Sequence, residues 1–263
     1  MKRTTKKYKD YEVFSQLKLP FNMPVIIRCD GRNFHKLSKE LNLQRPFDRN
    51  FAEIMTAAAK EVYEEGFNPS LIYVFSDEIN YIFTSELPFN RRLEKVLSII
   101  PSIISSKFTS LLISRIGRDL VVSFDARAIP IAREEILGYL QWRQNEAWRN
   151  CVNSYAYHAL LQMGYTPREA SKKLNGLKYS DRHEIIFKFL KININNVPTW
   201  QRRGILVYKE PYTIETVNRK TGEYVKVERR KIVENWEPPL FSSEEGISLV
   251  HLLLNRSFTR LTL

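Results

Sequence analysis

The stretch "YVFSDEINYIF", residues 73 to 83, sets two adjacent acids, Asp77 and Glu78, between runs of aromatic and β-branched residues. Such runs favour β-strands, so the stretch predicts a hairpin with the acids at or beside its turn. Two like charges side by side are unfavourable unless solvent, cations or basic side chains neutralise them. The hairpin is therefore either an ordinary polar turn or part of a cation site.

The segments around the hairpin predict a βαββαβ order of elements. In chain order we expect a strand at 24–30, a helix at 48–66, strands at 71–76 and 80–85, a helix at 91–114 and a strand at 120–127. This order is typical of an α+β ferredoxin-like fold. Right-handed crossovers in that fold bring Asp30, at the end of the first strand, and Asp77 to the same edge of the sheet.

The second half of the chain reads as helical at first and then as strands. We expect helices at 133–164, 166–175 and 180–190, a strand at 202–210, a long hairpin over 212–233 with its turn at 218–223, and a strand in the hydrophobic C-terminal stretch. No repeat or low-complexity tract interrupts this order.

The composition indicates a globular protein with a polyanionic partner. Lys and Arg number 41 against 29 Asp and Glu, for a formal net charge of +12, which favours nucleic acid, nucleotides or anionic lipid. Cys29 and Cys151 lack metal-ligand spacing and predict buried free thiols in a reducing compartment. Since no signal-peptide core follows the basic N-terminus and the apolar stretch 96–113 is broken by Pro101, we expect a cytoplasmic protein without a membrane span.

The acids also fit a metal site. Two carboxylates from separate strands, with Gly31 directly after Asp30, suit a hard divalent cation such as Mg²⁺. Two such ions would hold an attacking hydroxyl and a leaving pyrophosphate in line. The alternative is that both acidic segments are conformational turns. Basic residues that could attract phosphate flank both acidic segments. Near the first they are Arg28, Arg32, His35 and Lys36, and after the second they are Arg91, Arg92 and Lys95, which could also form an ordinary solvated first turn of a helix.

Taken together, "RCDGRNFHKLSKELNLQRPFD" and "YVFSDEINYIF" resemble the two signature segments of the tRNA-His guanylyltransferase family, including its relatives that extend RNA in the 3′-to-5′ direction. The similarity runs over residues 20–210, because later segments resemble further family blocks in the same order: "FNRRLEKVLS", "FDARAIPI", "YLQWRQNEAWRNCVNSYAYHAL", "DRHEIIFKF" and "NINNVPTWQRRGILVYKE". The resemblance implies a polymerase-type palm with an N-terminal extension in residues 1–132. Residues 133–263 would pack on it as helices and a β-hairpin, in one continuous globular unit.

The resemblance also implies an activity. In the family, ATP adenylylates the 5′-monophosphate of tRNA, and the 3′-hydroxyl of an incoming GTP then attacks the activated end. Two Mg²⁺ ions serve this chemistry, and members assemble as homotetramers built from dimers.

By matching position, the resemblance assigns metal binding to Asp30, Asp77 and the Gly31 carbonyl, with Glu78 completing the acidic catalytic set. Nucleotide binding falls to Arg32, His35, Arg45, Ser76, Arg92 and Lys95, and RNA binding to Arg28, Arg182, Arg202 and Arg203. Without its motif, His35 would read as an ordinary core or surface histidine. Arg45 stands where eukaryotic members carry Lys, which keeps the charge but changes the donor geometry. Lys226, Arg229, Arg230 and Lys231 lie outside the resemblance and read as a solvated face.

One segment departs from the eukaryotic pattern. Where eukaryotic members have His-Ile-Asn-Asn, this chain has Trp148, Arg149, Asn150 and Cys151. Selective recognition of tRNA-His through that segment is therefore not expected. The chain is more similar to archaeal or bacterial relatives, which restore missing 5′ nucleotides by copying the opposite strand.

Two other classes share parts of this pattern. An RNA recognition motif has the same order of elements, but it needs exposed aromatic residues in its central strands, and no such strand motif is present. A nucleotidyl cyclase with a related palm would also use an acidic hairpin and a divalent metal. It would leave the later basic and helical blocks without a role.

Overall fold

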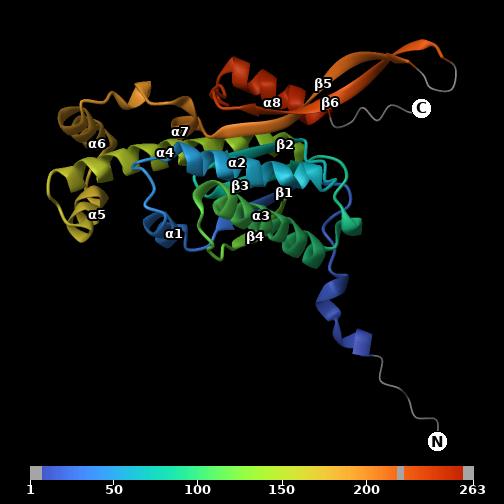
Figure 1. Ribbon diagram of the computed structural model, residues 1–263, viewed down its shortest axis with the longest axis horizontal. Helices are drawn as coiled ribbons and strands as arrows, with labels where there is room; N and C mark the ends of the chain where they lie inside the picture. The colour runs from blue at the N-terminus through green and yellow to red at the C-terminus, as the bar shows by residue number, and fades with distance from the viewer. Residues whose placement is uncertain (1–7, 218–221, 257–263) are drawn as a thin grey trace, which may run out of the picture.

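A computed structural model describes residues 8–217 and 222–256 of the chain (Figure 1). Its centre is a six-stranded sheet in the order β4-β1-β3-β2-β5-β6, in which every pairing is antiparallel. The strands are β1 (Val25–Gly31), β2 (Leu71–Phe75), β3 (Glu78–Phe83), β4 (Phe124–Pro130), β5 (Ile205–Val217) and β6 (Tyr224–Asn235). The first four have the ferredoxin-like order, which confirms the expected fold class, and β5 brings the second half of the chain into the same sheet.

One face of the sheet is covered by α2 (Arg49–Glu64) and α3 (Leu93–Ile116), and the short helix α1 (Phe34–Glu40) follows β1. Asp48 caps α2 as expected, since its carboxylate accepts the N–H of Phe51 at 2.9 Å. By length and composition α3 is apolar enough to cross a membrane, yet one side of it lies in the core beneath the sheet. The buried residues of α3 are Val96, Ile100, Pro101, Ile104, Phe108 and Leu112.

The other face is covered by α4 (Ile136–Gln162) and α8 (Glu244–Arg256). The aromatic side chains of β2 on this face, Tyr73 and Phe75, are therefore buried, and Tyr81 of β3 is buried on the face covered by α2 and α3. The described residues of the central strands β1, β2 and β3 thus lack the exposed aromatic surface that an RNA recognition motif uses.

The expected C-terminal strand is instead helix α8. A short apolar run does not by itself distinguish strand from helix. Glu244 and Glu245 in the first turn complement the helix dipole, and Val250, Leu253 and Leu254 have the spacing that buries one helical side against the sheet.

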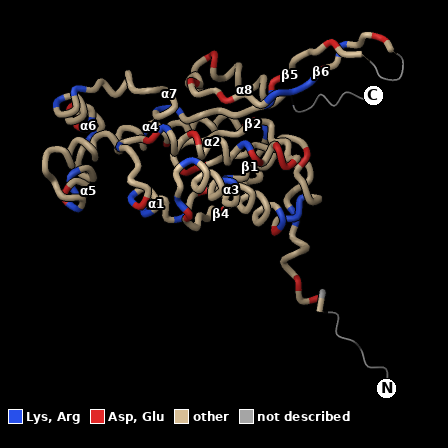
Figure 2. Tube along the Cα trace, in the orientation of Figure 1, with Lys and Arg blue, Asp and Glu red and all other residues tan. Residues whose placement is uncertain are grey.

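Beyond the sheet, α5 (Pro167–Asn175) and α6 (Tyr179–Ile185) lie at the far end of α4, while α7 (Thr199–Arg203) leads into β5 (Figure 1). The strands β5 and β6 continue past the body as a ribbon, and the expected turn at 218–223 falls partly outside the described residues. Basic residues lie along β6 (Figure 2). Two of them pair with acids across the ribbon, Lys226 with Glu215 and Lys231 with Glu210.

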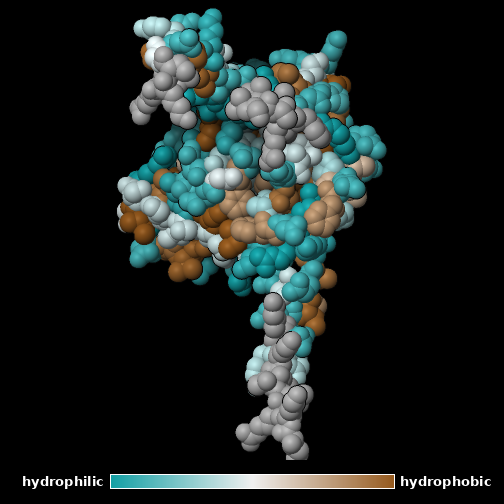
Figure 3. Space-filling view, turned by 90° about the vertical axis from the view of Figure 1, so that its right-hand side faces the viewer, coloured by the Kyte–Doolittle hydropathy of each residue, from teal (hydrophilic) through white to brown (hydrophobic). Residues whose placement is uncertain are grey.

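The N-terminal segment extends away from the body as two 3₁₀ turns, Tyr8–Tyr11 and Val13–Gln16 (Figures 1 and 3). A backbone bridge between Lys18 and Arg92 joins it to the start of α3. Several large apolar side chains on this segment are exposed: Tyr8, Tyr11, Val13, Phe14, Leu17 and Phe21. Deeper in the chain, Cys29 and Cys151 are buried free thiols, as expected.

Gly204, between α7 and β5, provides a test of how tightly the second half docks on the sheet. Its φ is +73°, and a Cβ there would lie 2.6 Å from the Tyr73 ring and 2.7 Å from the Val74 carbonyl oxygen. We expect Gly204→Ala to lower the free energy of unfolding by about 2–4 kcal/mol. Gly138→Ala, in α4 with nothing near its Cβ position, should raise it by about 0.5–1 kcal/mol. Urea unfolding measures both, and equal effects would contradict the packing described.

Candidate active site

The acidic edge of the sheet is built by the register of β1 and β3. Asp30 lies opposite Glu78, and the N–H of Gly31 donates to the carbonyl of Asp77 at 3.0 Å. Ser76 adopts a φ of +51° in the two-residue turn, and its hydroxyl donates to the Asp77 carboxylate at 3.1 Å. The expected meeting of the strand end with the hairpin turn is confirmed.

A polar cavity of about 250 Å³ lies between this edge and α4. The sheet contributes Asp30, Phe75, Asp77 and Glu78, and α4 contributes Arg143, Glu146, Arg149, Asn150 and Asn153. Burial raises the pKa of the Asp77 carboxyl, and the nearby charge of Asp30 adds to this shift, while hydrogen bonds to the backbone and to Ser76 oppose it. A cation in the cavity would relieve the same repulsion.

Asp30 and Asp77 are the residues that could hold a metal ion. Within residues 8–217 and 222–256, no group of three or more His, Cys, Asp and Glu is arranged to hold one. Two carboxylates still suit Mg²⁺, which completes its shell with water and substrate phosphates. Gly31 also has a packing role, because a Cβ there would lie 2.6 Å from the Phe34 ring. The donor set therefore fits Mg²⁺ bound together with a nucleotide.

Arginines neutralise much of the acidic edge. Both oxygens of Glu78 accept from Arg143, at 2.9 and 2.6 Å. Asp30 lies 3.8 Å from Arg28 and 3.4 Å from Arg127. Arg28, which was also expected to contact RNA, has a side chain that is 13% exposed and packs near Trp142. Contact with RNA stays a prediction for this residue.

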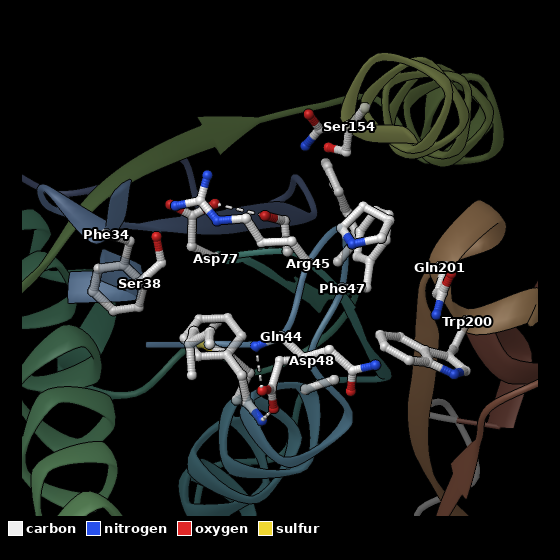
Figure 4. Close-up of a pocket in the computed structure, with 18 of the residues that line it drawn as sticks. Phe34, Ser38, Gln44, Arg45, Phe47, Asp48, Asp77, Ser154, Trp200 and Gln201 are labelled. Atoms are coloured by element: carbon white, nitrogen blue, oxygen red, sulfur yellow. Dashed lines mark hydrogen bonds between the residues drawn. The ribbon is translucent and has the colours of Figure 1, made fainter. Parts of the chain in front are cut away.

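A larger cavity of about 520 Å³ adjoins the acidic edge (Figure 4). It shares Phe75, Asp77 and Asn150 with the polar cavity, so the two meet at Asp77. Its walls come from the segment 34–48, α2, the hairpin turn, α4 and α7. The aromatic side chains that line it include Phe34, Phe47 and Trp200, and the polar side chains include Ser38, Gln44, Ser154 and Gln201. This volume and mixed lining are typical of pockets for small ligands.

Three of the expected nucleotide-binding residues, His35, Arg45 and Ser76, line the larger cavity. The loop that carries Arg45 is fixed by Asp48, which accepts the N–H of Gln44 at 2.9 Å. Arg32 is exposed beside the start of β4, where its N–H donates to the carbonyl of Ser123, and it lines neither cavity.

In this structure of a single chain, Arg92 and Lys95 do not flank the acids, so that expectation is wrong. β3 runs from Glu78 at the acidic edge to Phe83 at the opposite end of the sheet, and α3 starts only after that end. Arg91, beside them, donates to the carbonyl of Met23 just before β1 begins. Arg92 and Lys95 therefore lie at the far end of the sheet from Asp30 and Asp77.

The other arginines expected to bind RNA hold the second half together. Arg182 donates to Asn153 at 2.6 Å and to the carbonyl of Leu174 at 2.9 Å. Arg202 donates to the carbonyl of Val197, and Arg203 to that of Pro238. Each is partly exposed, so contact with RNA stays a prediction for these three.

Sequence reasoning missed the contributions of α4 and α7. Arg143 lies on the buried side of α4 with Ile136, Leu140 and Ala147. An arginine at helical spacing within a row of apolar residues indicates that its charge is buried and paired with an acidic side chain. No comparable signal marks Trp200 and Gln201 of α7 as cavity residues, because only the packing of α7 on the sheet brings them there.

The segment that departs from the eukaryotic pattern lies beside the acids. Arg149 and Asn150 line the polar cavity, and Asn150 also lines the larger one. Cys151 is buried, and Trp148 packs against His183 with ring centroids 5.9 Å apart. This stretch of α4 is therefore part of the site.

An antiparallel palm-type sheet with two carboxylates at its edge, next to a pocket of nucleotide size, defines the class of palm-type nucleotidyltransferases. Residues 5–132 match the family model described as tRNAHis guanylyltransferase, and residues 134–239 match the model described as Thg1 C terminal domain. The chain belongs to the tRNAHis guanylyltransferase family.

Curated relatives and solved structures agree with this assignment. The chain is 33% identical over 194 residues to a probable tRNA(His) guanylyltransferase of Drosophila melanogaster, covering 72% of this chain and 68% of the relative. It is 32% identical to the Dictyostelium discoideum protein of the same description, covering 81% and 85%. A bacterial tRNA(His) guanylyltransferase (Thg1)-like protein in complex with ATP aligns with a TM-score of 0.75 and 26% identity, over 94% of this chain and 96% of that one. The Saccharomyces cerevisiae tRNA(His) guanylyltransferase aligns with a TM-score of 0.67 and 28% identity, over 74% and 90%.

The larger cavity makes a prediction for nucleotide binding. Arg45→Ala removes a cation from its wall and should weaken ATP binding by about tenfold, the loss of one charge-assisted contact. Arg168→Ala on α5 removes the same charge at a position that lines neither cavity, and it should leave the Kd for ATP unchanged. Isothermal titration calorimetry compares the two, and an equal loss in both variants would show that only the overall charge matters.

Proposed function

We propose that this protein is a metal-dependent nucleotidyltransferase that adds or restores nucleotides, G in particular, at the 5′ end of tRNA in the 3′-to-5′ direction. The observation that carries this proposal is the meeting of the polar cavity and the nucleotide-sized cavity at Asp77, beside Asp30. Family membership supports it. So do the bacterial relatives whose structures are described as complexes with ATP and with GTP.

In the first step, ATP occupies the larger cavity, where His35, Arg45 and Ser76 bind its phosphates. An oxygen of the tRNA 5′-monophosphate attacks the α-phosphorus of ATP, the bond to the β-phosphate breaks, and pyrophosphate leaves. Two Mg²⁺ ions, held by Asp30, Asp77 and the Gly31 carbonyl, would neutralise phosphate charge and align the attacking and leaving oxygens. The product is a tRNA whose 5′-phosphate carries AMP.

In the second step, the 3′-hydroxyl of GTP attacks the activated 5′-phosphate. A phosphodiester bond forms, AMP leaves with the bonding electrons, and the hydroxyl proton passes to water. The walls of the two cavities orient the reactants, which converts an encounter in solution into a positioned reaction.

We propose two kinds of partner, tRNA and further copies of this chain. A net charge of +12 supports a polyanionic substrate such as tRNA. A homotetramer built from dimers stays a proposal, which the exposed apolar side chains of the N-terminal segment support. A cytoplasmic location is proposed on the sequence argument alone.

The carboxylate of Asp77, where the two cavities meet, should be required for both steps of the reaction. We expect Asp77→Asn to reduce both adenylylation and nucleotide addition by about 100-fold or more, because charge stabilisation of the reacting phosphates is lost. Asp125→Asn is the matched control: Asp125 lies opposite Asp30 on β4, is 61% exposed and lines neither cavity. Transfer of labelled AMP from ATP to 5′-monophosphorylated tRNA, and extension with GTP, measure the two steps. Near-normal turnover of folded Asp77→Asn would overturn the proposed site.

Nucleotide choice should depend on a templating base. Since Trp148–Cys151 replaces the eukaryotic segment, we expect a tRNA lacking its first 5′ nucleotide to be repaired with the complement of the opposite base, even when its anticodon is not GUG. Pairing and stacking align the incoming 3′-hydroxyl, whereas phosphate contacts bind every tRNA alike. Substrates with C or A opposite the gap test this. Addition of G regardless of that base, and only to tRNA with the GUG anticodon, would contradict it.

A further inference from the structure

Arg143 is a charge on the buried side of α4. Its side chain is 10% exposed, and its guanidinium lies 4.4 Å from the centre of the Trp142 ring and 5.3 Å from that of Phe75. A buried cation is unstable without a partner of opposite charge. That partner is Glu78, whose side chain is 8% exposed.

The ion pair uses both oxygens of Glu78. The Nε of Arg143 donates to Oε1 at 2.9 Å and an Nη donates to Oε2 at 2.6 Å, in the two-pronged geometry that binds a carboxylate most firmly. The side-chain amide of Asn80 donates to Oε1 at 2.8 Å, and the Tyr139 hydroxyl donates to Oδ1 of Asn80 at 2.6 Å. Three donors thus hold the Glu78 carboxylate, and α4 supplies two of the residues in this network.

Asp30 and Asp77 are held differently. Asp30 is 33% exposed, with its arginine neighbours at 3.4 and 3.8 Å, and Asp77 is partly exposed in the turn. Both carboxylates line the polar cavity together with Glu78. Three carboxylates at one edge would compete for the same cation, unless one of them is bound elsewhere.

We infer that Arg143 is a positioning residue that keeps Glu78 out of metal coordination, so that Asp30 and Asp77 are the two carboxylates of this edge that remain accessible to the cation and the substrate phosphates. This inference rests on the proposed function, since it concerns the same site. It assigns Glu78 a supporting role: together with Arg143, it anchors the hairpin turn that carries Asp77 to α4.

Binding of Mn²⁺, measured by electron paramagnetic resonance of the free ion, tests this inference without relying on turnover. Glu78→Gln should leave the Mn²⁺ affinity unchanged, whereas Asp77→Asn should weaken it by about tenfold or more. Arg143→Met frees the Glu78 carboxylate and should tighten Mn²⁺ binding by about tenfold while nucleotide addition falls. The double variant Glu78→Gln with Arg143→Met removes the freed carboxylate and should return the affinity to that of the unmodified protein.

Lys39→Met is the control for charge. Lys39 lines the adjoining larger cavity and not the polar one, whereas removal of Arg149 would free Glu146, another carboxylate of the polar cavity. If Arg143→Met and Lys39→Met change Mn²⁺ binding equally, only the lost positive charge matters and the inference is overturned. If Glu78→Gln weakens binding as much as Asp77→Asn does, Glu78 is a metal ligand and the inference is also overturned.

Two safeguards keep the outcome clear. Circular dichroism establishes whether each variant folds, and if Arg143→Met does not, the comparison of Glu78→Gln with Asp77→Asn decides. If Asp77→Asn binds Mn²⁺ as the unmodified protein does, the metal site itself is misplaced. That result would overturn the proposed function as well as the inference, whereas the other failures leave the proposed function standing.

Discussion

The antiparallel register between β1 and β3 is the constraint on which the site depends. It sets Asp30 opposite Glu78 and brings the N–H of Gly31 to 3.0 Å from the Asp77 carbonyl. A slip of one residue would turn Asp30 toward α2 and α3 and place Cys29 at the cavity. The core prevents that slip, because Val25, Ile27 and Cys29 are fully buried on the α2 and α3 side. The packing of an apolar strand thus fixes the geometry of a polar site.

The electrostatics of the edge then divides the acids into two kinds. Arg127 donates to the partly exposed Asp30 at 3.4 Å and Arg28 lies 3.8 Å from it, and such partly exposed pairs contribute little to stability. The pair of Arg143 and Glu78 is buried, and removing one partner would leave a charge without compensation. Glu78 is consequently bound within the protein, whereas Asp30 and Asp77 face the cavities. The acids that look alike in the sequence differ in what they are free to bind.

The sequence by itself determined the local elements and the position of the acidic edge. Asp48 caps α2 through its own first turn, Gly66 ends the segment with a φ of +85°, and the β2–β3 hairpin follows from its strand-forming runs. The meeting of Asp30 with Asp77 could also be predicted, because the βαββαβ order leaves few ways to arrange the strands. Each of these features depends on residues close in the chain or on the order of elements alone.

The tertiary structure decided the rest. The C-terminal apolar run had no unique period, and it is a helix because burial of Val250, Leu253 and Leu254 against the sheet selects that form. Spacing along the chain could not show that α3 begins at the far end of the sheet from the acids, which separates Arg92 from Asp77. Nor could it show that Arg143 meets Glu78 across 65 positions, or that α7 brings Trp200 to the larger cavity. Capping and periodicity act within a turn or two of chain, whereas ion pairs and cavities form only when distant segments pack together.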